Sequence, residues 1–179
     1  RGRRRRKRRG RLSKGEAESL DFYVNSNGYK QVNGTLRGEI TDAQRKNFPE
    51  MTAKYERDGK MHAGRLDSAI EKQPGFTSET VLYRGAAFDR EFKAGDSFSD
   101  KGFASTTTDR TKAASFAKAN SALGGGRKPV LLEIKAPAGR KALAGAALEK
   151  ELILPRGSTF TVTSKRTRGG LDIVTVVMK

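Results

Sequence analysis

The pattern of the sequence changes at about Thr80, and this change limits the folds that the chain can adopt. Before that point, apolar residues recur at the three- and four-residue spacing of amphipathic helices. After it, short runs rich in β-branched residues stand between glycine, proline and charged residues, which is typical of strands. These runs include Val130–Ile134, Leu152–Leu154, Thr159–Thr163 and Ile173–Val177. Helices followed by strands, rather than alternating with them, predict an α+β fold.

Local signals predict three helices in the first part of the chain. Ser13 and Glu16 have the spacing of a capping box, which predicts the start of a helix. Thr41 begins a second, short helix that Phe48–Pro49 interrupts, because proline disfavours helical backbone in the residue before it. The third helix is predicted over about Met61–Lys72, which places several apolar residues on one face.

Positive charge is concentrated at the start of the chain. The formal net charge is +17, and the first eleven residues carry nine positive charges, which leaves +8 for the rest. Because like charges repel, residues 1–14 are predicted to form a disordered basic arm or linker, followed by one folded domain over 15–179. Such an arm could bind nucleic acid, act as a nuclear-type address or a translocation segment, or tether an acidic partner. It could equally be a cleavage boundary at an arginine-rich linker.

Composition argues against several classes of site. The chain has no cysteine, so disulfides and thiolate metal sites are excluded, and its single histidine, His62, has no second histidine near it; no metal is expected. No apolar run is long enough to span a membrane, and no apolar stretch follows the basic start as in a signal peptide. The first residue is arginine rather than methionine, so we expect a processed or excised piece of a longer chain.

Two acids at alternate positions, Glu149 and Glu151, precede an apolar run that Pro155 stops. In a strand, alternate side chains project from the same face, so these two carboxylates are predicted to share one small site. Like charges at such close range repel each other, which is more usual in an active site than on a surface. The alternative interpretation is an edge strand that Glu149, Lys150 and Glu151 keep soluble.

Two upstream segments favour the active-site interpretation. The β-prone run Val81–Gly85 carries Arg84 at its end, and the run Phe98–Thr108 carries the hydroxyls of Ser105, Thr106 and Thr107. Each segment alone has an ordinary explanation, as a solvated arginine or as a turn and helix cap. The ordered combination of arginine, Ser-Thr-Thr and Glu-x-Glu is more specific. It resembles the Arg-Ser-Glu class of mono-ADP-ribosyltransferases, in particular the bacterial exoenzyme-toxin family that includes the actin-modifying binary toxins.

The resemblance extends from about Phe22 to the end of the chain. Tyr29, Asn33 and Arg37 match the N-terminal segment of that family, and Phe116 falls where the family places an aromatic residue against nicotinamide. The resemblance implies a single catalytic domain with a helical N-terminal layer followed by two roughly perpendicular, mainly antiparallel β-sheets. It also implies NAD as co-substrate. No Gly-x-Gly-x-x-Gly motif follows a strand, so a Rossmann mode of NAD binding is not expected.

The family's chemistry gives each residue an expected role. Cleavage of the bond between nicotinamide and ribose develops positive charge on the sugar, which a fixed carboxylate stabilises. By resemblance, Glu151 would bind the ribose 2′-hydroxyl, Ser105 would hold Glu151 by a hydrogen bond, and Glu149 would orient an acceptor arginine. Arg84 would bind phosphate, and Gly85 would let the backbone approach nicotinamide. The expected cofactor pocket comprises Arg84, Gly85, Tyr29, Asn33, Arg37, Ser105, Thr106 and Phe116.

The acceptor is less constrained than the cofactor. Thr107 replaces the last serine of the usual Ser-Thr-Ser, and residues 139–148 before the acids contain no aromatic residue of the kind that relatives often use on their targets. We expect transfer to arginine of a target protein, with accompanying NAD glycohydrolase activity. The alternatives are ADP-ribosylation of RNA or DNA and an inactive nucleic-acid-binding module. The resemblance implies a secreted or injected toxin or effector that acts in the cytoplasm of its target cell, with a neutralising or delivery partner, or a phage enzyme that acts in its host's cytoplasm.

Overall fold

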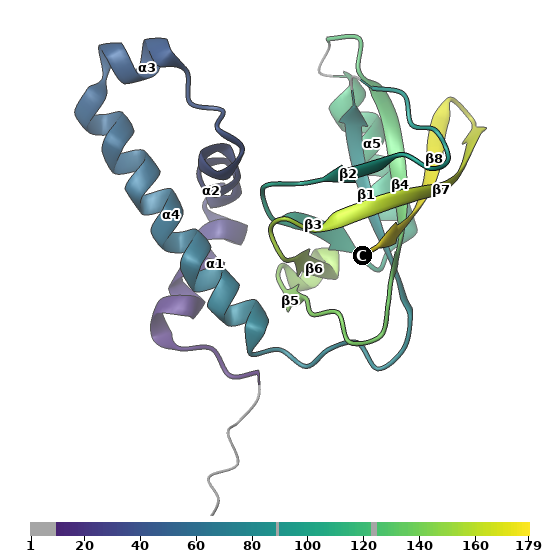
Figure 1. Cartoon of the computed structure of the whole chain (residues 1–179), viewed down its shortest axis with the longest axis horizontal. Coiled ribbons are helices and arrows are strands. Elements are labelled where there is room, and N and C mark those ends of the chain that lie inside the picture. Colours follow the sequence, from purple (N-terminus) through teal and green to yellow (C-terminus); the bar gives the residue numbers. More distant parts are fainter. Residues whose placement is uncertain (1–9, 89, 123–124) are drawn as a thin grey trace, which may run out of the picture.

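The computed structural model describes residues 10–88, 90–122 and 125–179 and shows helices followed by strands, which confirms the predicted α+β fold (Figure 1). Most of the predicted basic arm, residues 1–9, lies outside the described residues. The helices are α1 (Lys14–Asn25), α2 (Gly28–Arg37), α3 (Asp42–Asn47), α4 (Pro49–Glu71) and α5 (Arg110–Ala122).

The strands form one hydrogen-bonded sheet of eight members in the order β2-β7-β8-β4-β1-β3-β6-β5. Their bounds are β1 (Thr80–Phe88), β2 (Ser97–Ser99), β3 (Ala104–Thr107), β4 (Lys128–Ala136), β5 (Leu143–Ala144), β6 (Glu151–Leu154), β7 (Thr159–Arg168) and β8 (Leu171–Met178). Neighbouring strands are antiparallel except β4 and β8, which are parallel. A single residue pair, Tyr83 opposite Thr107, joins β1 to β3. The two expected sheets are therefore a five-stranded and a three-stranded part of one continuous sheet.

The predicted helix starts are confirmed at α1 and α3, whereas α4 is longer than predicted. The Glu16 N–H donates to Ser13 Oγ at 3.2 Å, and the Ser13 N–H donates to Glu16 Oε2 at 2.8 Å, which completes the capping box. The predicted start of the third helix near Met61 was wrong, because α4 begins at Pro49. Proline ends α3 and also suits the first turn of a new helix, where its missing N–H is not needed. Phe48 therefore ends one helix and precedes the next.

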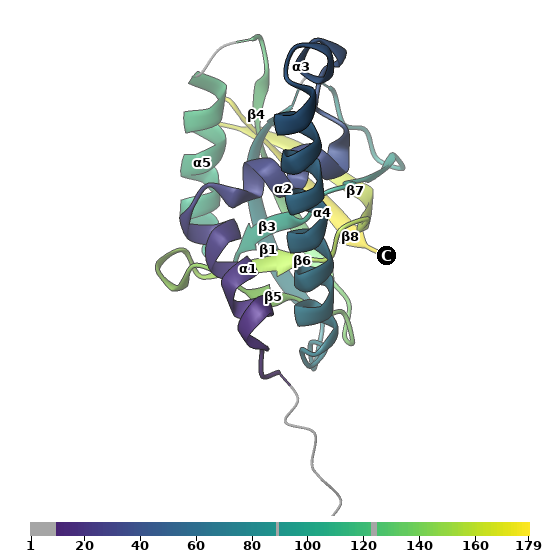
Figure 2. The ribbon, with the colours of Figure 1, turned by 90° about the vertical axis from the view of Figure 1, so that its left-hand side faces the viewer.

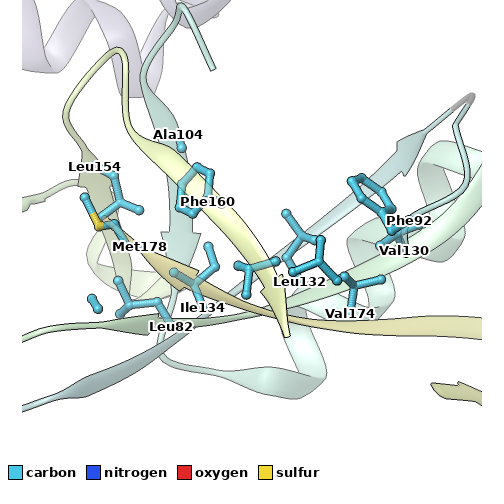
Figure 3. Close-up of a cluster of buried hydrophobic side chains, with 13 residues drawn as sticks. Leu82, Phe92, Ala104, Val130, Leu132, Ile134, Leu154, Phe160, Val174 and Met178 are labelled. Carbon is cyan, nitrogen blue, oxygen red and sulfur yellow. The ribbon is translucent and has the colours of Figure 1, made fainter. Parts of the chain in front are cut away.

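Three buried apolar clusters hold the layers together. The first lies between one face of β1, β4 and β8 and the strand β7 (Figure 3). Its members are Leu82, Phe92, Ala104, Val130, Leu132, Ile134, Ala136, Leu154, Phe160, Val162, Val174, Val176 and Met178. Leu131 and Ile173 alternate with these residues and face the other way, where α5 packs on them. The third cluster joins Tyr23, Leu66 and other helical residues to Phe103 and Ile153, so the helical layer covers β3 and β6 (Figure 2).

A buried carboxylate fastens the start of α1 to the end of α4. Glu16 accepts hydrogen bonds from Lys72 Nζ at 2.7 Å and from Ser68 Oγ at 2.7 Å, in addition to the Ser13 N–H. Burial alone would raise the pKa of Glu16, but the hydrogen bonds from Lys72, Ser13 and Ser68 outweigh it and lower that pKa from 4.5 to about 2. The ionised form of Glu16 is therefore the one that stabilises this junction.

Replacement of Glu16 by glutamine is expected to lower the free energy of unfolding at neutral pH by on the order of 2–3 kcal/mol. Because the folded-state pKa is depressed, the contribution of Glu16 is complete above pH 4.5 and is lost as the pH falls toward about 2. Urea unfolding across this range should show the difference between wild type and variant shrinking. Glu18→Gln, at an exposed position of the same helix, should change little. This interpretation would be contradicted if the free energy of unfolding fell no more steeply toward acidic pH in the wild type than in Glu16→Gln.

Candidate active site

The ten residues predicted for the site all line one cleft of about 580 Å³, although they come from five separate segments of the chain. They are Tyr29, Asn33, Arg37, Arg84, Gly85, Ser105, Thr106, Phe116, Glu149 and Glu151. Strand register brings the central ones together. Tyr83 lies opposite Thr107, and Thr107 in turn lies opposite Glu151, so the segments that carry Arg84, Ser105 and Glu151 are adjacent.

The carboxylate of Glu151 is fixed by the loop that precedes it. The Ala146 N–H donates to Glu151 Oε2 at 2.8 Å, and two backbone hydrogen bonds tie Glu151 to Gly145 and Ala146. The prediction that Ser105 holds Glu151 by a hydrogen bond was wrong, because the hydroxyl of Ser105 instead pairs with the Tyr23 hydroxyl at 3.4 Å. A backbone donor orients Glu151 because β5 and β6 bring residues 145–146 against it.

Gly145 leaves the space that this carboxylate occupies. A Cβ at Gly145 would lie 2.2 Å from Glu151 Oε2 and 2.7 Å from its Cδ, too close for both groups to keep their positions. The backbone of Gly145 does not have a positive φ, so alanine suits its conformation. The side chain of Glu151 would therefore have to move while the loop keeps its path.

Given the role that the resemblance implies for Glu151, Gly145→Ala is expected to reduce turnover of NAD by about a hundredfold while the melting temperature changes little, because the clash displaces that carboxylate. Initial rates of nicotinamide release from NAD, measured together with thermal unfolding, test this. Gly64→Ala is the matched control, because a Cβ at Gly64 in α4 would contact nothing within 4 Å. Full activity in Gly145→Ala would show that the position of Glu151 is not critical.

Glu149 reaches the cleft by a different route from the one predicted. The structure ends the short 3₁₀-helix η1 (Ala147–Glu149) at this residue, Lys150 adopts a left-handed conformation with φ of 48°, and β6 begins only at Glu151. The strand-alternation argument for Glu149 was therefore wrong, because a turn separates the two acids. Both nevertheless line the cleft.

The backbone of this turn is pinned, whereas its side chains face outward. Thr107 Oγ1 donates to the Glu149 carbonyl at 2.6 Å, and Lys112 Nζ donates to the Leu148 carbonyl. Glu149 is exposed, and Leu148 beside it is 89% exposed. The function of Thr107 was not predicted; its hydroxyl also accepts from the Asp109 N–H at 3.0 Å, which couples the turn to the start of α5.

Two arginines of the cleft share one carboxylate. Arg37 donates from Nε and Nη2 to the two oxygens of Asp100 at 2.9 and 2.8 Å, and Arg84 Nη2 lies 3.9 Å from Asp100 Oδ2. Burial lowers the pKa of Arg84 and Asp100 opposes this effect. At Arg37 burial acts in the same direction, but the hydrogen bonds to Asp100 outweigh it and raise that pKa. Asp100 was not predicted from the sequence, where an aspartate two residues before a glycine suggests only a turn.

A buried tyrosine, also not predicted, supports the serine. Tyr23 is 1% exposed, and its hydroxyl accepts from Asn33 Nδ2 at 3.1 Å as well as pairing with Ser105. Burial raises the pKa of Tyr23. The amide of Asn33 is further occupied by the backbone of Phe103, to which it donates at 3.2 Å and from which it accepts at 2.8 Å. Asn33 therefore positions the wall of the cleft through Tyr23 and Phe103.

The remaining predicted residues divide into wall and surface positions. Thr106 donates to the Leu152 carbonyl at 2.6 Å, which fastens β3 to β6. Gly85 has a packing function, since a Cβ there would lie 1.7 Å from the Ala113 carbonyl oxygen and would push α5 off the sheet. Tyr29 and Phe116 are 42% and 51% exposed, which leaves aromatic faces open along the cleft.

Within residues 10–88, 90–122 and 125–179, no helix has the length and apolar character needed to cross a bilayer. The same residues contain no group of three or more histidine, cysteine, aspartate or glutamate side chains placed to hold a metal ion.

Comparison with known proteins points to one family. The family model described as ADP-ribosyltransferase exoenzyme matches residues 2–174. A search of curated proteins by sequence finds no match.

Solved structures share the fold. The Vis toxin, an ADP-ribosyltransferase from Vibrio splendidus, superposes with a TM-score of 0.75 at 22% identity over 94% of this chain and 74% of its own. The C3 exoenzyme of Clostridium limosum gives a TM-score of 0.67 at 20% identity, covering 96% and 88%. Exoenzyme S of Pseudomonas aeruginosa, solved with human 14-3-3 protein beta and carba-NAD, gives 0.64 at 16% identity, covering 93% and 74%.

Proposed function

The chain belongs to the ADP-ribosyltransferase exoenzyme family, and we propose that it transfers ADP-ribose from NAD to arginine side chains of a target protein. The observation that carries this proposal is the meeting of Glu149, Glu151, Arg84 and Ser105 in one cleft. Acidic residues that serve only solubility are not expected to cluster with a half-buried arginine and a serine from two other strands.

The cleft suits NAD as the family's substrate. Its volume of about 580 Å³ is of the size that encloses small ligands. Arg37 and Arg84 offer guanidinium groups for a diphosphate, and Tyr29 and Phe116 offer aromatic faces for the nicotinamide and adenine rings. Carba-NAD bound to exoenzyme S supports a dinucleotide ligand for this fold.

Glu151 is the residue we assign to the bond-breaking step. As nicotinamide leaves, positive charge develops on the ribose, and an anion held in place stabilises that charge without having to reorganise. The Ala146 N–H and the space left by Gly145 hold the Glu151 carboxylate in this way. Tyr23 and Ser105 form the adjoining wall of the cleft.

Glu149 is the residue we assign to the acceptor. A guanidinium group is protonated at ordinary pH and is a poor nucleophile, so a carboxylate must orient it and accept its proton. Glu149 is exposed on a pinned turn and lines the same cleft as Glu151, which suits that task. The structure of the Vis toxin with agmatine, a small guanidinium compound, supports an arginine-type acceptor.

A protein target suits the surface around Glu149. Leu148 is 89% exposed next to the acid, where it provides an apolar contact in place of the aromatic residue that this loop lacks. We propose that the chain acts as a toxin or effector domain inside the cells that it targets.

Incubation with labelled NAD and a cell lysate tests this function. We expect the label to enter macromolecules, to be released by protease and to resist nuclease. Labelling that nuclease releases would instead support nucleic acid as the acceptor. No labelling, together with no release of nicotinamide, would contradict the enzymatic function itself.

A further inference from the structure

We propose that Asp100 is a positioning residue that holds Arg37 and Arg84 ready for the diphosphate of NAD. This inference rests on the proposed function. Asp100 lies outside the lining of the cleft and acts through the two arginines, both of which line it.

The geometry gives Asp100 control over the direction of Arg37. Both carboxylate oxygens accept from Arg37, at 2.9 and 2.8 Å, so the planar guanidinium is fixed in position and in rotation. This paired arrangement uses Nε and Nη2 and leaves Nη1 free of Asp100. A diphosphate can then be bound by an arginine that has already lost its conformational freedom.

Asp100 is itself held in place from behind. Its Oδ1 accepts from the Gly102 N–H at 2.8 Å, and its side chain is only 20% exposed. A Cβ at Gly102 would lie 2.7 Å from Asn33 Oδ1 and 3.1 Å from Arg37 Nε, so the turn packs directly against the arginine. The carboxylate of Asp100 therefore fixes Arg37 relative to this turn.

Charge explains why the two arginines need a shared partner. Burial is the main cause that lowers the pKa of Arg84, and repulsion from Arg37 adds to it. Asp100, 3.9 Å from Arg84 Nη2, opposes both effects. Arg84 also donates from Nη1 to the Ser105 carbonyl at 3.4 Å, which places it between the turn and β3. Two guanidinium groups and one carboxylate carry a net charge of +1, opposite to the net charge of NAD, whose diphosphate bears two negative charges and whose pyridinium bears one positive charge.

Asp100→Asn tests the inference because it removes the charge and keeps the size of the side chain. We expect the KM for NAD, and the Kd for ADP-ribose, to rise about tenfold or more, with kcat changed much less. ADP-ribose is a suitable probe because it retains the diphosphate and lacks nicotinamide. Arg37→Gln should raise both constants to a similar extent, and the double variant should be little worse than either single variant, because the two side chains act as one unit.

Asp96→Asn is the matched control, since Asp96 precedes β2 where Asp100 follows it, does not line the cleft, and should leave both constants unchanged. Thermal unfolding of each variant identifies a loss of fold. If Asp100→Asn does not fold, the test rests on Arg37→Gln, which must raise the KM for NAD and the Kd for ADP-ribose. Unchanged or tighter binding of ADP-ribose to a folded Asp100→Asn would overturn the inference, because Asp100 would then be only a counter-charge. Wild-type protein that binds neither NAD nor ADP-ribose would instead reject the proposed function.

Discussion

Replacement of Glu151 by glutamine is expected to lower the rate of NAD cleavage about a thousandfold, both with and without an acceptor. Glutamine has the same shape and can still accept from the Ala146 N–H, so the loop should keep its structure. What disappears is the negative charge beneath the ribose. Because that charge stabilises only the transition state, kcat should fall while the KM for NAD stays within about threefold.

Nicotinamide release under saturating NAD measures this effect, and circular dichroism with thermal unfolding confirms that the variant is folded. Glu71→Gln is the control, because Glu71 is exposed and pairs with Lys141 outside the cleft. A Glu151→Gln protein that retains more than about a tenth of wild-type kcat would remove Glu151 from the bond-breaking step.

Glu149→Gln is expected to separate two reactions that Glu151→Gln abolishes together. Transfer to an arginine-type acceptor should fall by about a hundredfold or more, since proton removal from the acceptor is lost. Hydrolysis of NAD by water should change by less than about threefold, because water does not need a carboxylate to orient a guanidinium. The pinned backbone of the turn makes this separation feasible, because Thr107 holds the Glu149 carbonyl and not its side chain.

Agmatine provides a defined acceptor for this experiment. ADP-ribosyl agmatine and free ADP-ribose are measured in the same reaction by chromatography, so each variant serves as its own reference. Equal loss of both products in Glu149→Gln would assign Glu149 to NAD cleavage rather than to the acceptor. No loss of either would place Glu149 outside the reaction.

Local signals in the sequence predicted most of the fold. Ser13 and Glu16 set the start of α1 by hydrogen bonds three residues apart. Asp109 caps α5 at the same spacing, with its Oδ1 accepting from the Lys112 N–H at 3.2 Å. The start of α4 was missed because Pro49 both ends one helix and begins the next. The joining of the two sheets by one pair at Tyr83 depends on tertiary packing, which no local pattern encodes.

The candidate site residues that could be predicted are those whose chemistry requires a particular residue type. The residues that were missed are those whose importance depends on their position in the fold. Arg84, Ser105 and the two acids have spacing and order that indicate a family. Asp100 and Tyr23 resemble an ordinary turn residue and an ordinary core residue, and only the fold brings them to Arg37 and Ser105. Gly145 is similar, because its importance depends on where the carboxylate of Glu151 points.

Tandem mass spectrometry of proteins labelled in a lysate gives the most direct answer on what the enzyme modifies. Wild-type protein and NAD should produce ADP-ribose attached to arginine side chains, and Glu151→Gln should produce none. ADP-ribose on another residue type, or on nucleic acid alone, would contradict arginine as the acceptor. The same arginine-linked product formed equally by Glu151→Gln would contradict the assignment of this cleft as the active site.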